Sequence, residues 1–158
     1  MIYYNIYIDG LYTYILFVIP SEYILLEMSE SDISNFLLKS AALLGSSGIG
    51  LGAFGAHALK AKIESRSPSL GLENWKTAVM YQLFHASALL ALSSISRGNK
   101  SMSSSLERSG KMMLLGSVMF SGSIYCLCLN IGPRKLMGPI TPVGGLFMIG
   151  GWLTLAVA

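Results

Sequence analysis

Residues 112–131 read MMLLGSVMFSGSIYCLCLNI, a run of twenty residues without a charged side chain. An α-helix rises about 1.5 Å per residue, so a run of this length crosses the roughly 30 Å hydrocarbon core of a bilayer. Lys111 precedes the run, and the segment Gly132-Pro133-Arg134-Lys135 follows it as a predicted turn. The stretch therefore predicts a transmembrane helix.

Three further stretches have the same character. They cover residues 36–59, 77–96 and 140–158. Buried helices of a large soluble protein would be shorter and would carry charges on an exposed face. Only 12% of this chain is charged, whereas soluble domains have about a quarter. The predicted fold class is an all-α integral membrane bundle of four transmembrane helices.

The first 35 residues differ from the rest. The stretch from Met1 to Ile19 is apolar and rich in tyrosine, but Asp9 and Gly10 interrupt it. A charge at mid-bilayer costs about 2.5–3.5 kcal/mol on insertion scales, which disfavours a fifth spanning helix. We therefore predict a non-spanning N-terminal extension over residues 1–35 and a four-helix transmembrane domain over residues 36–158. Either Met28 is the natural start, or the first segment is a mobile or interfacial appendage.

Two features near the ends of the predicted helices concern membrane placement. The segment from Ser93 to Ser109 is rich in Ser, Gly, Asn and Lys, which predicts a solvated linker. Trp75 lies at the start of the second helix and is expected at the membrane interface. Trp152 is expected either at an interface or inside the bundle.

Small residues recur along the first helix. Gly45, Gly48, Gly52 and Ala56 are spaced by three and four residues and so form one stripe. Such stripes let helices approach closely in lipid, which we favour over a pore lining. The third and fourth helices have comparable sets, namely Ser117 and Ser121, and Gly144, Gly145, Gly150 and Gly151.

Polar side chains inside the spans mark the candidate site, because such groups are costly in lipid and need partners. We predict an intramembrane polar site formed by His57, Tyr81, Gln82 and His85, with His57 turned inward toward the second helix. For the two histidines themselves, we favour neutral side chains hydrogen-bonded between helices as a structural device over a ligand or proton-handling role. His57 and His85 differ by about 10 Å in predicted depth, without an acidic or thiolate partner, so we predict no metal and no cofactor.

Catalytic motifs are not found in the sequence. The spans hold no acidic residue to orient a histidine, and Gly50 to Gly55 match the dinucleotide pattern only by chance, inside a helix without a preceding strand. Cys126 and Cys128 lie two residues apart, point to nearly opposite helix faces and act as small buried hydrophobes. The net charge of +3 is dispersed, so we expect no nucleic-acid partner.

Four segments, in order, resemble a known family. They are GAFGAHALK at 52–60, WKTAVMYQLFHA at 75–86, FSGSIY at 120–125 and GPITPVGG at 138–145. The chain from Leu37 to its end is similar to the transmembrane protein 256 family, also described as domain of unknown function 423. Ala58 departs from the glycine expected there. The resemblance implies four membrane helices and no established activity.

The function expected from these features is association in the bilayer. The leading hypothesis is a non-enzymatic multi-pass protein that acts by helix packing, with other membrane proteins or with itself as partner. The alternative is transport of a small solute or ion through an oligomer, with His57, Gln82 and His85 lining a polar path. An intramembrane enzyme is the least favoured, because general acid–base chemistry needs tuned partners.

Overall fold

The structure is a computed structural model that describes residues 4–8, 11–15, 21–66, 70–98 and 102–158. Its elements, in chain order, are β1 (Tyr4–Ile8), β2 (Leu11–Ile15), α1 (Ser21–Ala56), α2 (Lys60–Arg66), α3 (Gly71–Gly98), α4 (Ser103–Cys128) and α5 (Arg134–Ala156).

The prediction of four membrane helices is confirmed. Four stretches are long and apolar enough to cross a bilayer, namely Asp32–Ala56, Gly71–Gly98, Ser104–Cys128 and Arg134–Ala156. The short helix α2 was not predicted from the sequence, and it buries Ile63 under the end of the bundle. The turn predicted at Gly132 joins α4 to α5, and Gly132 has a φ of 77°, which glycine adopts without strain.

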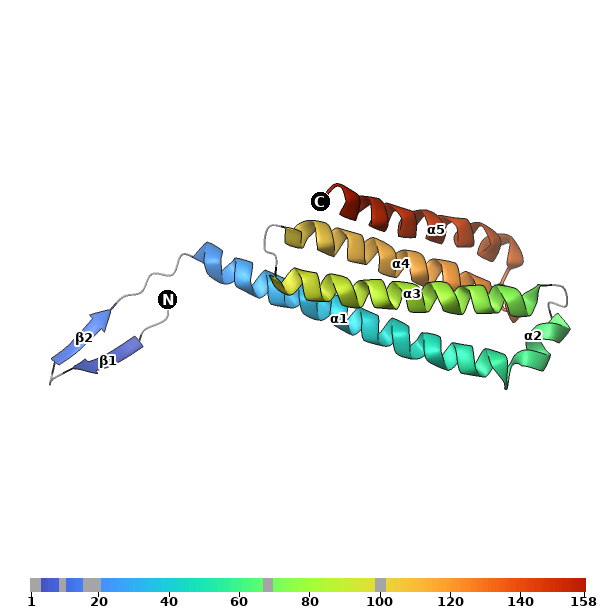
Figure 1. Ribbon diagram of the computed structural model, residues 1–158, viewed down its shortest axis with the longest axis horizontal. Helices are drawn as coiled ribbons and strands as arrows, with labels where there is room; N and C mark the ends of the chain where they lie inside the picture. The colour runs from blue at the N-terminus through green and yellow to red at the C-terminus, as the bar shows by residue number, and fades with distance from the viewer. Residues whose placement is uncertain (1–3, 9–10, 16–20, 67–69, 99–101) are drawn as a thin grey trace.

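The four long helices form an open row rather than a closed bundle (Figure 1). Consecutive long helices are antiparallel neighbours: α1 packs along α3, α3 along α4, and α4 along α5. The outer helices α1 and α5 do not pack against each other, so the row has two edges. Each edge helix presents an apolar side to the lipid.

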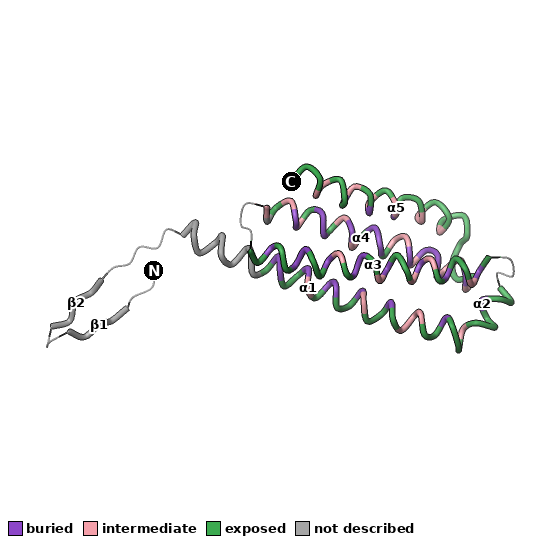
Figure 2. Tube along the Cα trace, viewed as in Figure 1, coloured by how far each residue is buried: buried purple, intermediate pink, exposed green. Residues whose placement is uncertain are grey.

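The apolar core lies where α1, α3 and α4 converge. Its fully enclosed residues include Leu37, Leu89, Leu106 and Met113. Figure 2 shows that burial follows the inner sides of α1, α3 and α4, whereas α5 is largely exposed along its length. In α5 the buried residues are Gly144, Met148 and Gly151, so this helix is held along one narrow strip.

The predicted linker from Ser93 to Ser109 is mostly helical, so that prediction is wrong. Residues 93–98 complete α3, and residues 103–109 belong to α4. The serines are used inside the protein: the Ser93 hydroxyl donates to the Ser34 carbonyl at 2.9 Å, and the Ser109 hydroxyl donates to the Gly151 carbonyl at 2.8 Å. The prediction failed because a segment rich in serine has the composition of a linker. In a membrane bundle, however, a serine hydroxyl can bond to a carbonyl of a neighbouring helix.

The N-terminal region contains a hairpin followed by the start of α1. Strands β1 and β2 pair antiparallel, with Tyr4 opposite Ile15. Helix α1 begins at Ser21 and continues through residue 36 without a break, so the predicted division at residue 35 does not coincide with a change of secondary structure. The separate role of residues 1–35 stays a prediction.

The small-residue stripe of α1 faces α3, which confirms the packing interpretation. A Cβ at Gly48 would come within 2.9 Å of the Leu83 side chain, and one at Gly52 within 3.2 Å of Val79. Ala56, at the end of the helix, is exposed. The α5 glycines face α4 in the same way, since a Cβ at Gly144 would lie 2.5 Å from the backbone nitrogen of Phe120. Both stripes are therefore occupied within the chain.

Candidate functional site

Gln82 is the centre of a buried polar network that joins three helices. Its side-chain nitrogen donates to the Leu44 carbonyl and to the Ser47 hydroxyl of α1, each at 2.9 Å. Its side-chain oxygen accepts from the Tyr125 hydroxyl of α4 at 2.9 Å. Gln82 is only 5% exposed, and both of its amide donors and its oxygen are engaged. This amide therefore fixes α1, α3 and α4 against one another.

Trp75 lies beside this network and is 2% exposed, so its indole packs inside the bundle, and its depth at the membrane interface stays a prediction. Its indole N–H donates to the Leu51 carbonyl of α1 at 2.9 Å, and its ring lies 4.6 Å from the ring of Tyr125. Gly55 makes this contact possible, because a Cβ there would collide with the indole. The physical reason for the burial is that an indole gains from enclosure once its N–H has an acceptor.

His85 follows Gln82 by three residues and is also buried, at 3% exposed. Its Nδ1 lies 2.8 Å from the Tyr81 carbonyl oxygen. A carbonyl only accepts, so Nδ1 carries the proton, and in a neutral imidazole Nε2 is then an acceptor. A charged imidazole would be costly in this apolar position. In the described part of the chain Nε2 has no hydrogen-bond partner, so half of this side chain is unsatisfied.

His85 also lines a groove between α3 and α5, with α4 beneath it, although its Nε2 is enclosed. The groove has a volume of about 420 Å³. We call it the His85 groove; its lining residues are Met80, Tyr81, Phe84, His85, Phe120, Gly145, Met148, Ile149 and Trp152.

Aromatic rings form most of the walls of this groove. The Trp152 ring lies 5.9 Å from that of Phe84 and 6.5 Å from the imidazole of His85. The Tyr81 ring lies 4.8 Å from that of Phe120. No charged side chain lines the groove. Its character is that of a mostly apolar binding site whose polar side chains are Tyr81 and His85.

The four predicted site residues do not form one cluster. Tyr81, Gln82 and His85 lie on α3, but Gln82 faces α1 and α4 whereas Tyr81 and His85 face the His85 groove. His57 lies in the turn after α1, is exposed, and makes no side-chain hydrogen bond to any described residue. The prediction of an inward-facing His57 is wrong, because α1 ends at Ala56 and the chain turns away there.

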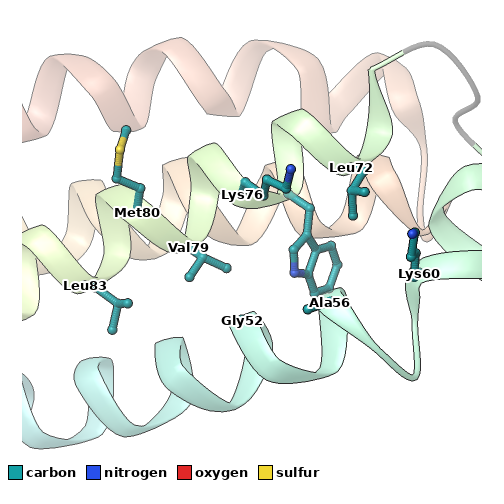
Figure 3. Close-up of a pocket in the computed structure, with 10 residues that line it drawn as sticks. Gly52, Ala56, Lys60, Leu72, Lys76, Val79, Met80 and Leu83 are labelled. Atoms are coloured by element: carbon teal, nitrogen blue, oxygen red, sulfur yellow. The ribbon is translucent and has the colours of Figure 1, made fainter.

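A second hollow lies between α1 and α3 near α2 (Figure 3). It has a volume of about 610 Å³, and Gly52 and Ala56 of α1 lie across it from Val79 and Leu83 of α3. Lys60 and Lys76 are the charged side chains at its edge, and the Lys76 ammonium donates to Glu73 at 2.9 Å. The indole N–H at its floor is already bonded, so no unsatisfied polar group among its lining residues points to a ligand.

The sequence interpretation missed Phe84, Phe120 and Trp152 as parts of a site. Phe84 directly precedes His85, and Tyr81 precedes it by one helical turn, so an aromatic cluster around an intramembrane histidine was visible in the sequence. Trp152 is far from it along the chain, and only the antiparallel placement of α5 brings it to His85.

Metal-binding clusters do not occur in the part of the chain that the structure describes, where no group of three His, Cys, Asp or Glu side chains converges. Cys126 and Cys128 are both free; Cys128 is buried and Cys126 is half-buried. The Cys128 thiol donates to the Gly71 carbonyl, which ties α4 to the first turn of α3.

The fold and this site define an integral, multi-pass membrane protein whose bundle is held by a saturated amide network. The family described as protein of unknown function DUF423 matches residues 51–145. The chain belongs to this family, which confirms the resemblance drawn from its four motifs.

Relatives cover most of the chain. A UPF0382 membrane protein of Schizosaccharomyces pombe is 41% identical over 120 residues, which is 74% of this chain and 95% of the relative. A UPF0382 inner membrane protein of Escherichia coli is 37% identical over 125 residues, which is 78% of this chain and 88% of the relative. No solved structure matches the chain.

Proposed function

We propose that the protein is a non-enzymatic membrane protein whose function is to bind a component of the bilayer in the His85 groove. The observation that supports this proposal is that His85 lines an aromatic groove while its buried Nε2 has no hydrogen-bond partner among the described residues. Buried polar groups are rarely left without a partner, because the desolvation cost is not recovered. A bound molecule would supply the partner.

Catalysis is not part of this proposal. A histidine that moves protons needs a second group, such as a carboxylate, to orient it or share the charge. The groove contains no carboxylate, and the hydrogen bond from Nδ1 ends on a backbone carbonyl. Gln82, the other polar side chain of the predicted site, is fully engaged in holding helices together.

The transport alternative receives less support from the same contacts. A polar path through His57, Gln82 and His85 would need groups that exchange partners with a solute. Gln82 lies between α1, α3 and α4 with its bonds made, and His57 is exposed beyond the end of α1. Opening a path through Gln82 would break the contacts that join these three helices.

The experiment compares two substitutions on α5 that differ only in position. Gly145 lines the His85 groove, whereas a Cβ at Gly138 would meet nothing within 4 Å. Native mass spectrometry of protein released directly from membrane vesicles should show a small molecule bound at one per chain. Gly145→Phe should abolish that mass because the ring fills the groove, and Gly138→Phe should retain it. Wild-type protein without a bound molecule, or equal retention in both variants, would contradict the proposal.

Association with another membrane protein is a second candidate, and the placement of α5 favours it. This helix packs mainly on α4, contacts α3 through Trp152, and leaves Leu146 and Leu153 on an apolar outer side, 67% and 62% exposed. In lipid such a side can pack against a partner's helix. Photo-crosslinking from position 146, with position 43 on the outer side of α1 as control, should give a defined protein adduct only from α5. Equal, diffuse labelling from both positions would argue against it.

A further inference from the structure

We infer that the His85 groove binds a neutral, ring-bearing molecule that donates a hydrogen bond, of the phenol or hydroquinone class. The inference rests on the proposed binding function and adds the chemistry of the ligand. It is drawn from three properties of the groove: the direction of the free hydrogen-bonding group, the nature of the walls, and the charge of the lining.

Nε2 of His85, the nitrogen without a partner in the described part of the chain, is a hydrogen-bond acceptor. Nδ1 of His85 is committed to the Tyr81 carbonyl at 2.8 Å, and a carbonyl oxygen cannot donate, so the proton is on Nδ1. The lone pair of Nε2 therefore needs a donor. An O–H or N–H of a ligand satisfies it, whereas an ether, ester or quinone oxygen presents only another lone pair. Nε2 of His85 therefore favours a ligand with a hydroxyl group over the corresponding methyl ether.

The walls favour a flat ring. The rings of Tyr81, Phe84 and Trp152 lie 6.3, 5.4 and 6.5 Å from the imidazole, and Phe120 packs on Tyr81. Aromatic rings pair best with other rings in offset or edge-to-face contact. A volume of about 420 Å³ lies at the smaller end of ligand sites, roughly 300–1,000 Å³, and accommodates one substituted ring with part of an alkyl chain. A linear acyl chain would leave these ring faces without a matching surface.

The lining favours a neutral molecule. No charged side chain lines the groove, and His85 sits about 21 Å along α3 from Gly71, well inside the span. A ligand with a carboxylate or an ammonium group would be unpaired there and would lose its hydration. The hollow near α2 differs in this respect, because Lys60 and Lys76 stand at its edge.

Access to Nε2 requires a side chain to move. The nitrogen is enclosed, and the rings of Phe84 and Trp152 lie 5.4 and 6.5 Å from the imidazole. These two rings are 57% and 43% exposed, so either can turn toward the lipid without leaving a packed core. Trp152 is thus both the cover of the site and a reporter of its occupancy.

Among the described residues, the buried hydroxyls of Ser96 and Ser117 also lack partners, but they do not point to ligands. A serine in a helix can turn about χ1 and bond to the carbonyl one turn back in its own helix. The imidazole of His85 has already used that option through Nδ1, and its other nitrogen points away from the helix backbone. His85 alone therefore needs a partner from outside its own helix.

The test uses two probes of nearly equal size, 4-nonylphenol and its methyl ether 4-nonylanisole, added to the full chain in phosphatidylcholine nanodiscs. Trp152 fluorescence is the signal, with Trp152→Phe as the control that leaves only Trp75. The phenol should bind about 3- to 10-fold more tightly than the anisole, the range expected for one neutral hydrogen bond. His85→Phe keeps a ring but removes the acceptor, and it should lower phenol affinity to the level of the anisole.

Each outcome has a separate meaning. If phenol and anisole bind equally, and His85→Phe changes neither, the donor chemistry is wrong while binding in the groove stands. If neither probe produces a saturable Trp152 signal, the inference fails because the groove does not accept a neutral ring. A purified protein in which His85 coordinates a metal or haem would also overturn it, because the lone pair would be taken.

Discussion

Gln82 and His85 are two buried polar side chains on the same helix, three residues apart, with opposite fates. Gln82 faces α1 and α4 and makes three hydrogen bonds of 2.9 Å. His85 lines the His85 groove, and among the described residues its side chain bonds only to a carbonyl of its own helix, with Nε2 left without a partner. Gln82 contacts helices on two sides, whereas His85 lines the groove beside the exposed residues Phe84 and Trp152.

This difference assigns separate roles to two residues of α3: Gln82 to stability and His85 to the proposed binding. A polar group that finds all its partners inside the chain contributes to stability and has nothing left with which to bind. A group with one free lone pair contributes less to stability and is available to a ligand. Removing each should therefore produce opposite results in assays of folding and binding.

The largest expected effect comes from separating α5 from α4, which would remove one wall of the His85 groove. A Cβ at Gly144 would lie 2.5 Å from the Phe120 nitrogen and 2.8 Å from the Gly116 carbonyl oxygen, both backbone atoms. Gly144→Ala should destabilise the protein by about 1–3 kcal/mol, the usual cost of overpacking. Chemical unfolding in detergent measures this.

Gly145→Ala is the matched control for that variant. Its Cβ would meet only a Phe120 ring carbon, at 4.0 Å, so stability should be unchanged or slightly higher. Equal losses in both variants would show that α4 and α5 do not approach as closely as described.

An effect of comparable size is expected at Gln82, whose hydrogen bonds are all made. Gln82→Leu should destabilise the protein by about 1–3 kcal/mol, because the Tyr125 hydroxyl is left buried without its acceptor. Tyr125→Phe should cost about 0.5–1.5 kcal/mol. The double variant should lose less than the sum, since each single change breaks the same bond. Strict additivity in a double-mutant cycle would mean that the two side chains do not interact.

A smaller effect on stability is expected from substitution of His85. His85→Phe should change the free energy of unfolding by less than about 0.5 kcal/mol, because the Tyr81 carbonyl keeps its helical bond and one unpaired nitrogen disappears. The thermal unfolding midpoint is the measurement. A loss as large as that of Gln82→Leu would make His85 a structural group and remove the contrast.

The smallest effect on stability should come from changes in the N-terminal region, since Gln82 and His85 both lie on α3 and outside that region. We propose that residues 1–35 are an extension of the four-helix domain, and deletion of residues 1–27 should leave insertion and stability unchanged. Carbonate extraction and the unfolding midpoint measure the two properties. A truncated chain that does not insert would show that the start of α1 is structurally required.

Much of the fold was predictable because insertion into lipid constrains sequence strongly. A helix that crosses the bilayer must be apolar over its length, so the four spans appear as charge-poor runs. The ends of the helices were less predictable. Ser93 to Ser109 has the composition of a linker, and only the partners of its serines, such as Ser34 and Gly151, show that most of it is helical.

The candidate site was predictable as a set of residues but not as an arrangement. The cost of polar groups in lipid singled out Gln82 and His85, which both proved buried. Gln82 and His85 have different neighbours because α1 and α5 lie on different sides of α3. The residues around Gln82 and His85 in the sequence do not show where those helices pack. His57 was misplaced for a similar reason, because the end of α1 fell before it rather than after it.

The arrangement of the helices in an open row has a consequence for how the domain assembles. Contacts within the pairs α1–α3 and α4–α5 are more extensive than those between α3 and α4, so the domain consists of two helical hairpins joined at one seam. Each hairpin brings its own close glycine contacts, and each can enter the bilayer as a unit before the two meet. A chain divided at residues 99–101 should then reassemble from its halves. The His85 groove, which takes its histidine from one hairpin and its tryptophan from the other, would exist only after they join.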